Sequence, residues 1–143
     1  MPFADFQPSL RDKGDLNDLS SALVHYQKGL LITKKGRLGD LTSALSSYRT
    51  SLGIADKLVG RDSSNMEWRT DLVRSLSKVA GVLELQGTAQ RAEAEVDYRR
   101  ALALLQPVVD ENRLTEEQKT LNSQLHARLE ELLKKNHSRE NER

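Results

Sequence analysis

The sequence contains no cysteine, few aromatic residues and no long uncharged run. Without cysteine the chain has no disulfide, no thiolate metal ligand and no thiol nucleophile. Aromatic residues make up 4% of the chain, too few for the stacking platforms that bind single-stranded nucleic acids. No run free of Asp, Glu, Lys and Arg exceeds nine residues, whereas a membrane-spanning helix needs about 20 apolar residues.

The charges are nearly balanced, since 22 Lys and Arg stand against 21 Asp and Glu and leave a formal charge of +1. This balance gives no electrostatic footprint for nucleic acid or an anionic membrane. The first eight residues lack the basic flank and apolar run of a signal peptide. The absence of cysteine also suits a reducing compartment. We therefore expect a cytoplasmic protein with no nucleic-acid and no membrane partner.

The most informative feature of the chain is an internal repeat. Residues 17–32 recur as residues 39–54, and eight of the sixteen positions are identical. A more distant copy within residues 91–104 keeps the spacing of one alanine, one tyrosine and one leucine, as Ala94, Tyr98 and Leu102. Repetition at this scale indicates a stacked-helix array, which usually serves as a binding scaffold.

Apolar residues recur at three- and four-residue steps in five segments, so the sequence predicts an all-α fold of about five helices. The expected helices cover residues of about 16–35, 39–59, 66–85, 89–107 and 116–133. Residues 1–14 are expected to form an irregular arm, residues 15–133 one helical domain, and residues 134–143 a frayed polar tail.

Caps and stripes support this division. Asn65, or a serine just before it, is the expected N-cap of the third helix, and Thr115 with Gln118 forms a capping-box pattern at the start of the fifth. The residues expected to face inward on the third helix are Trp68, Leu72, Leu76, Val79, Ala80 and Leu83. The first helix carries one apolar stripe, made of Leu16, Leu19, Leu23, Tyr26 and Leu30.

The segment that begins Gly39-Asp-Leu and continues with Ala44, Tyr48 and Leu52 resembles the second helix of a tetratricopeptide repeat. Residues 66–87 are similar to the extended first helix of a long-period bacterial subtype. The resemblance covers about residues 14–110. It implies antiparallel helical hairpins stacked as a short right-handed solenoid. An offset of 22 residues has room for only one helix and a turn, so the first two helices are both of the second-helix type.

The resemblance also implies a binding groove lined by exposed residues of the first helices. Its positions correspond here to Arg74, Ser77, Lys78, Gly81 and Glu84. We take Arg74, Ser77, Lys78 and Glu84 as candidate partner-binding residues. The carboxylate-clamp arrangement of the family cannot be assigned to these positions, so recognition of a peptide C-terminus is not predicted.

Catalytic and metal-binding patterns are absent from the sequence. His25, His126 and His137 show no HxxxH or HExxH spacing, and no glycine-rich phosphate loop occurs. An acidic group, Glu84, Glu93, Glu95 and Asp97, is better explained as a solvated helix face than as general acid or base groups. Tyr26, Tyr48 and Tyr98 share a repeat position and are expected to pack between helices. We expect no enzyme activity, no cofactor and no metal.

Two functions of different class fit these observations. The leading hypothesis is an adaptor that binds a protein or peptide segment in a shallow groove of the first, third and fifth helices. The alternative is a self-association module. So short an array leaves the apolar faces of its terminal helices uncovered, and Leu19, Leu23 and Leu30 would then lie in a homodimer interface. A remnant of a longer repeat array is a further hypothesis.

Overall fold

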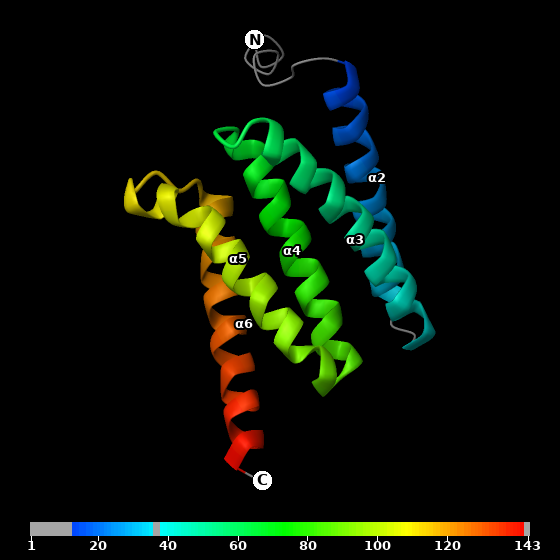
Figure 1. The fold of residues 1–143 in the computed structure, drawn as a ribbon, viewed down its shortest axis with the longest axis vertical. Helices are drawn as coiled ribbons and strands as arrows, with labels where there is room; N and C mark the ends of the chain where they lie inside the picture. Colours follow the sequence, from blue (N-terminus) through cyan, green and yellow to red (C-terminus); the bar gives the residue numbers. More distant parts are fainter. Residues whose placement is uncertain (1–12, 36–37, 142–143) are drawn as a thin grey trace. The chain divides into compact units, whose positions relative to one another are not determined.

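The computed structural model describes residues 13–35 and 38–141, and all regular structure within these ranges is helical. The α helices are α2 (Lys13–Lys35), α3 (Leu38–Arg61), α4 (Met66–Gln86), α5 (Arg91–Asp110) and α6 (Glu116–Asn141), with a short 3₁₀ helix η2 (Thr88–Gln90) before α5 (Figure 1). The predicted all-α class with five α helices is confirmed for this part of the chain. Residues 13 and 14, predicted to belong to the irregular arm, are the first two residues of α2. Residues 1–12 of that arm, the expected helix end at Gly36 and residues 142–143 lie outside the described residues.

The chain divides into two compact units, residues 1–75 and residues 76–143. We refer to them as the first unit and the second unit. The division falls inside α4, so each unit includes part of this helix. A single helical domain over residues 15–133 stays a prediction.

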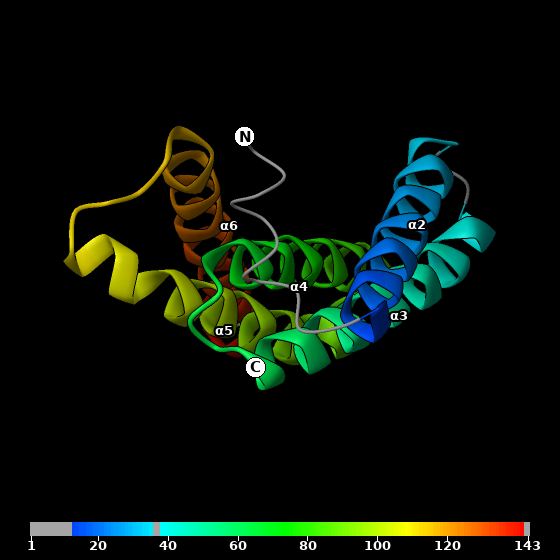
Figure 2. The same ribbon diagram turned by 90° about the horizontal axis from the view of Figure 1, so that it is seen from above.

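In the first unit, α2 and α3 pack against each other and run in opposite directions (Figures 1 and 2). The tyrosines of the two repeat copies meet between them, because the rings of Tyr26 and Tyr48 form an edge-to-face contact with centroids 5.7 Å apart. Gly29 permits this approach, since a Cβ atom at its position would lie only 2.6 Å from the Tyr48 ring. The repeat thus produces a close helix pair.

The start of α4 is fixed by side-chain hydrogen bonds. The Trp68 backbone N–H donates to Asn65 Oδ1 over 3.1 Å, which confirms Asn65 as the N-cap. In the preceding turn, the hydroxyl of Ser64 donates to Asp62 Oδ1 over 2.6 Å. The six residues expected to face inward on this helix are all buried.

In the second unit, α5 packs against α6. Gly87, with φ of 128°, ends α4 in a conformation that L-residues rarely adopt, and so confirms the predicted break. Pro107 lies inside the last turn of α5, and its carbonyl accepts a hydrogen bond from the Glu111 N–H. At the start of α6, the Thr115 N–H donates to Gln118 Oε1 and the Gln118 N–H donates to Thr115 Oγ1, which confirms the capping box.

The last helix is longer than the sequence analysis predicts. α6 continues past Lys134 to Asn141, where a frayed tail was expected. The absence of apolar residues led to that expectation, but Lys, Arg and Glu have good intrinsic helix propensity. An ion pair between Lys134 and Glu130, four residues apart, adds local support.

The apolar stripe of α2 also differs from a core face. Leu23 and Leu30 are 56% and 38% exposed, whereas Tyr26 between them is half-buried. The side chains of Leu16 and Leu19 lie outside the described residues. The remaining members of the stripe therefore divide into one inner residue and two outer ones.

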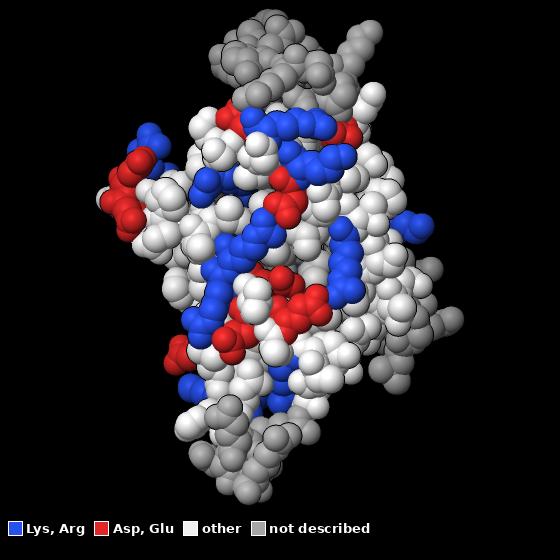
Figure 3. Space-filling view, viewed as in Figure 1, with Lys and Arg blue, Asp and Glu red and all other residues white. Residues whose placement is uncertain are grey.

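The charged side chains are mixed in sign. On the face drawn in Figure 3, basic and acidic groups are interleaved. Among the described residues, no helix has both the length and the apolar character that crossing a bilayer requires.

Candidate functional site

A cavity of about 390 Å³ opens in the first unit. Residues of α2, α3 and the first part of α4 line it, and its apolar walls are Ala22, Leu23, Tyr26, Ala55, Leu58 and Trp68. Ala55, Leu58 and Trp68 form the buried part of the wall, since each is at most 3% exposed. At the rim, Leu23 remains accessible. The cavity is thus an apolar recess with an exposed leucine at its edge.

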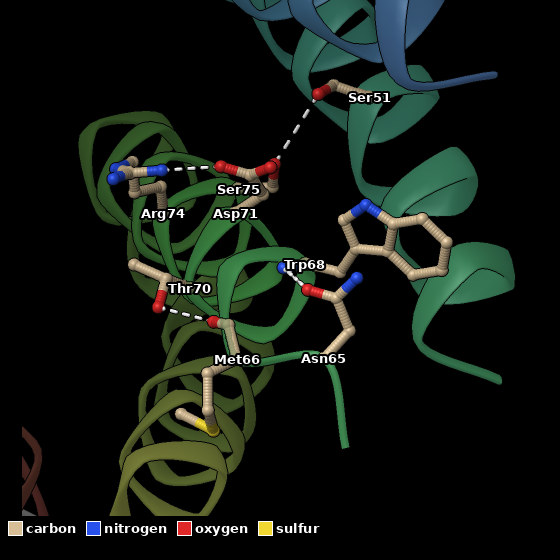
Figure 4. A network of polar contacts seen from close by, with 8 residues as sticks. All are labelled: Ser51, Asn65, Met66, Trp68, Thr70, Asp71, Arg74 and Ser75. Carbon is tan, nitrogen blue, oxygen red and sulfur yellow. Dashed lines mark hydrogen bonds and ion pairs between the residues drawn. The ribbon is translucent and has the colours of Figure 1, made fainter. Parts of the chain in front are cut away.

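Small residues of α2 and α3 create the space. Ala22 of α2 and Ala55 of α3 line the cavity where larger side chains would fill it. Ser51 of α3 and Ser75 of α4 also line it, and their hydroxyls are 3.4 Å apart in a buried hydrogen bond that joins the two helices (Figure 4). One serine hydroxyl donates and the other accepts, so each oxygen has a hydrogen-bond partner within the pair, and the recess keeps a mainly apolar character.

Charged groups line the cavity on the side of α4. Glu67, Asp71 and Arg74 follow one another at four- and three-residue steps and therefore share one face of this helix. The Arg74 guanidinium donates a hydrogen bond to Asp71 Oδ1 (Figure 4). Partial burial, followed by the nearby Asp71 carboxylate, raises the pKa of Glu67 above its ordinary value. Two carboxylates against one guanidinium give this wall a net negative charge.

The four candidate partner-binding residues separate between the two units. Arg74 lines the cavity of the first unit, whereas Ser77, Lys78 and Glu84 belong to the second unit. Glu84 accepts a hydrogen bond from the hydroxyl of the buried Tyr98, so this carboxylate has an internal structural partner. The assignment of these residues to partner binding stays a prediction.

Lys78 lies near a cation that the sequence analysis did not connect with it. Burial, followed by the positive charge of Arg128, lowers the pKa of Lys78. Arg128 of α6 also lies beside Gly81, where an added Cβ would be 3.6 Å from its Nη1 atom. The sequence alone does not reveal that Arg128 is a neighbour of Lys78, because the two residues lie on different helices.

The remaining titratable groups have surface or structural roles. His25 is half-buried, and His126 and His137 are exposed, as expected for helix-surface or boundary residues. Within the acidic group, Glu95 forms an ion pair with Arg99. In the described part of the chain, no three His, Cys, Asp or Glu residues are arranged to hold a metal ion.

The cavity could be found only in part from the sequence. Trp68 was expected to be buried, and it is, but hydrophobic periodicity does not reveal that it borders an open space. Glu67 and Asp71 carried no signal that separated them from other surface carboxylates. Comparisons of the chain with protein families, with curated proteins and with solved structures found no match.

Proposed function

We propose that the chain is a short tetratricopeptide-like module that binds a protein partner and takes an apolar side chain of that partner into the cavity of the first unit. The observation that carries this proposal is the apolar recess of about 390 Å³ with a charged wall. Recesses with apolar walls and a few polar groups are the usual form of small-molecule sites, and anchoring side chains of protein partners also fill well-packed pockets. The antiparallel pairing of α2 with α3 and the repeat pattern support the tetratricopeptide likeness.

The charged wall defines the chemistry of the partner segment. Glu67 and Asp71 are close enough for the Asp71 carboxylate to raise the pKa of Glu67, and Arg74, which acts on both carboxylates, leaves one net negative charge. A cationic side chain beside the carboxylates would relieve this repulsion. The proposed ligand is therefore a peptide segment with a large apolar residue next to a lysine or arginine. Such recognition needs no cofactor, metal or catalytic group, and the proposal keeps the expected cytoplasmic location.

A peptide selection tests this proposal. A randomised peptide library is selected on the immobilised full-length chain, and the enriched sequences should combine an apolar residue with a neighbouring basic one. A synthetic peptide of the enriched sequence is then titrated into the chain. Trp68 is the only tryptophan and lines the cavity, so its fluorescence reports occupancy without a label.

Two variants locate the binding. Ala55→Leu places extra carbon atoms in the cavity, and we expect it to weaken binding of the selected peptide at least tenfold while the chain remains helical. Glu67→Gln should weaken it several-fold and make the affinity less dependent on salt. Val96→Glu, at a 62% exposed position in the second unit, is the control and should leave affinity unchanged. Selected peptides that bind wild type and Ala55→Leu equally would refute the proposal.

A further inference from the structure

The outer face of α2 is apolar and uncovered. Leu23, Val24, Leu30 and Leu31 are between 38% and 65% exposed. They are four of the six large hydrophobic residues that are exposed in the described part of the chain. The opposite side of the helix is occupied, since Ala22 and Gly29 are buried there. An apolar face of this kind marks an interaction surface.

The four residues are arranged symmetrically along the helix. Gln27 is at the centre, Val24 and Leu30 lie three residues from it on either side, and Leu23 and Leu31 lie four residues from it. Gln27 is itself exposed. A turn of 180° about an axis through Gln27 therefore maps each apolar position onto another apolar position.

We propose that this face binds the same face of a second copy of the chain, with the two α2 helices antiparallel and Gln27 on the two-fold axis. An isologous interface requires a surface that is complementary to itself after a two-fold rotation, and the symmetric stripe meets that requirement. Leu23 then faces Leu31 of the second copy, and Val24 faces Leu30. The two Gln27 amides approach each other, and a carboxamide can both donate and accept a hydrogen bond.

The distribution of charge along α2 favours the antiparallel direction. Along the sequence of α2, Lys13, Asp15 and Asp18 leave one net negative charge near the N-terminal end, whereas Lys28, Lys34 and Lys35 give three positive charges toward the C-terminal end. Asp18 also forms an ion pair with Arg61 of α3. An antiparallel pair brings acidic and basic ends together, and a parallel pair would bring like charges together. The antiparallel arrangement also opposes the two helix dipoles.

The size of the face sets the expected strength. One helix from each copy contributes about two turns of apolar surface, which is small compared with the roughly 1,200–2,000 Å² that stable interfaces bury. We therefore expect a reversible dimer whose population depends on concentration, with a dissociation constant in the micromolar range or weaker.

Sedimentation velocity of the full-length chain tests the association. Over a roughly hundredfold range of concentration, the weight-average sedimentation coefficient of the wild type should rise toward that of a dimer. Leu31→Glu should abolish this rise, because it places two carboxylates in the apolar contact. Val96→Glu removes an equally exposed apolar residue outside α2 and should dimerise like wild type. A wild-type chain that stays monomeric throughout would overturn the proposal.

Cross-linking tests the direction of the pair. The chain has no cysteine, so a single introduced thiol can bridge only to the same position in another copy. Gln27→Cys lies on the proposed axis and should form a disulfide-linked dimer under mild oxidation. At Ser20, two copies would be about 21 Å apart in an antiparallel pair, given a rise of 1.5 Å per residue, which is too far for a disulfide. Ser20→Cys should therefore form no disulfide-linked dimer, and efficient cross-linking of both variants would show a parallel pair and overturn the proposal.

Leu23 borders the cavity and also lies on the proposed interface, so the variants that separate the two surfaces are placed at other residues. Leu31 and Gln27 do not line the cavity, and Ala55 is on α3. Loss of self-association in Leu31→Glu with intact peptide binding would separate the two surfaces. Failure of the peptide selection leaves the sedimentation and cross-linking outcomes fully informative.

Discussion

Tyr48 in the first unit and Tyr98 in the second occupy the same position of the repeat, and both are buried. Their surroundings differ. Tyr48 packs against Gly29 and the ring of Tyr26, next to helices that also border an open cavity. Tyr98 donates a hydrogen bond to Glu84, and nearby Ala101, Leu105 and Leu132 are completely buried. The same repeat position thus makes a ring contact with the cavity-lining Tyr26 in the first unit and a hydrogen bond with Glu84 in the second.

The largest expected effect comes from truncating a core leucine in each unit. Leu105→Ala in the second unit should lower the free energy of unfolding by about 2–5 kcal/mol, because Leu105 is fully buried. Leu58→Ala in the first unit should cost less, since one side of Leu58 already faces the cavity and loses fewer contacts. Urea unfolding measures both values. Equal losses would mean that the cavity is filled in solution.

A substitution at Gly29 tests how closely α2 approaches α3. Gly29→Ala should destabilise the chain by about 1–3 kcal/mol, because the added methyl group overlaps the Tyr48 ring. Gly53→Ala on α3 is the matched control, since an added Cβ there meets no atom within 4 Å. It should stabilise the chain by up to about 1 kcal/mol through helix propensity. Stabilisation by both variants in thermal unfolding would show that the helices are further apart.

The hydrogen bond between Tyr98 and Glu84 tests the polar part of the second unit. Tyr98→Phe keeps the ring and removes the hydroxyl, so it should cost about 1–2 kcal/mol. Glu84→Gln keeps an acceptor and should cost less. Burial of Tyr98, followed by its hydrogen bond to Glu84, raises the pKa of its hydroxyl, so the part of the ultraviolet titration that disappears in Tyr98→Phe should lie above the ordinary tyrosine value. Loss of a step at the ordinary value would contradict this account.

The smallest expected effect concerns Lys78. Because the pKa of Lys78 is lowered in the folded chain, the charged form opposes folding at neutral pH. Lys78→Met should therefore stabilise the chain, by less than about 1 kcal/mol since the group is partly solvated. As pH rises toward the ordinary lysine value of 10.5, the folded wild type loses its proton first and the difference between the two chains should shrink. If the difference in unfolding free energy between wild type and Lys78→Met grew with pH, the lowered pKa of Lys78 would be contradicted.

The helices could be predicted because their caps and apolar patterns depend on residues close together in the sequence. Contacts between different helices leave no such local pattern. The Asn65 cap and the reciprocal pair of Thr115 and Gln118 depend on neighbours within one turn, and both are confirmed. The extent of α6 beyond Lys134 was missed because the prediction relied on apolar residues, whereas intrinsic propensity and ion pairing support a polar helix.

The candidate site was harder to predict because it depends on three helices at once. Periodicity correctly placed Trp68 in the interior, but the space beside it arises from Ala22 and Ala55 on two other helices. Periodicity likewise placed Leu23 and Leu30 on one stripe. It cannot show what covers a stripe, and in the structure both residues are exposed.

The binding role of the first unit is tested most directly by amide hydrogen exchange of the full-length chain, with and without the selected peptide. The account predicts added protection in α2, α3 and the first turns of α4, with exchange in α5 and α6 unchanged. Protection concentrated in α5 and α6, with none around Trp68, would contradict it.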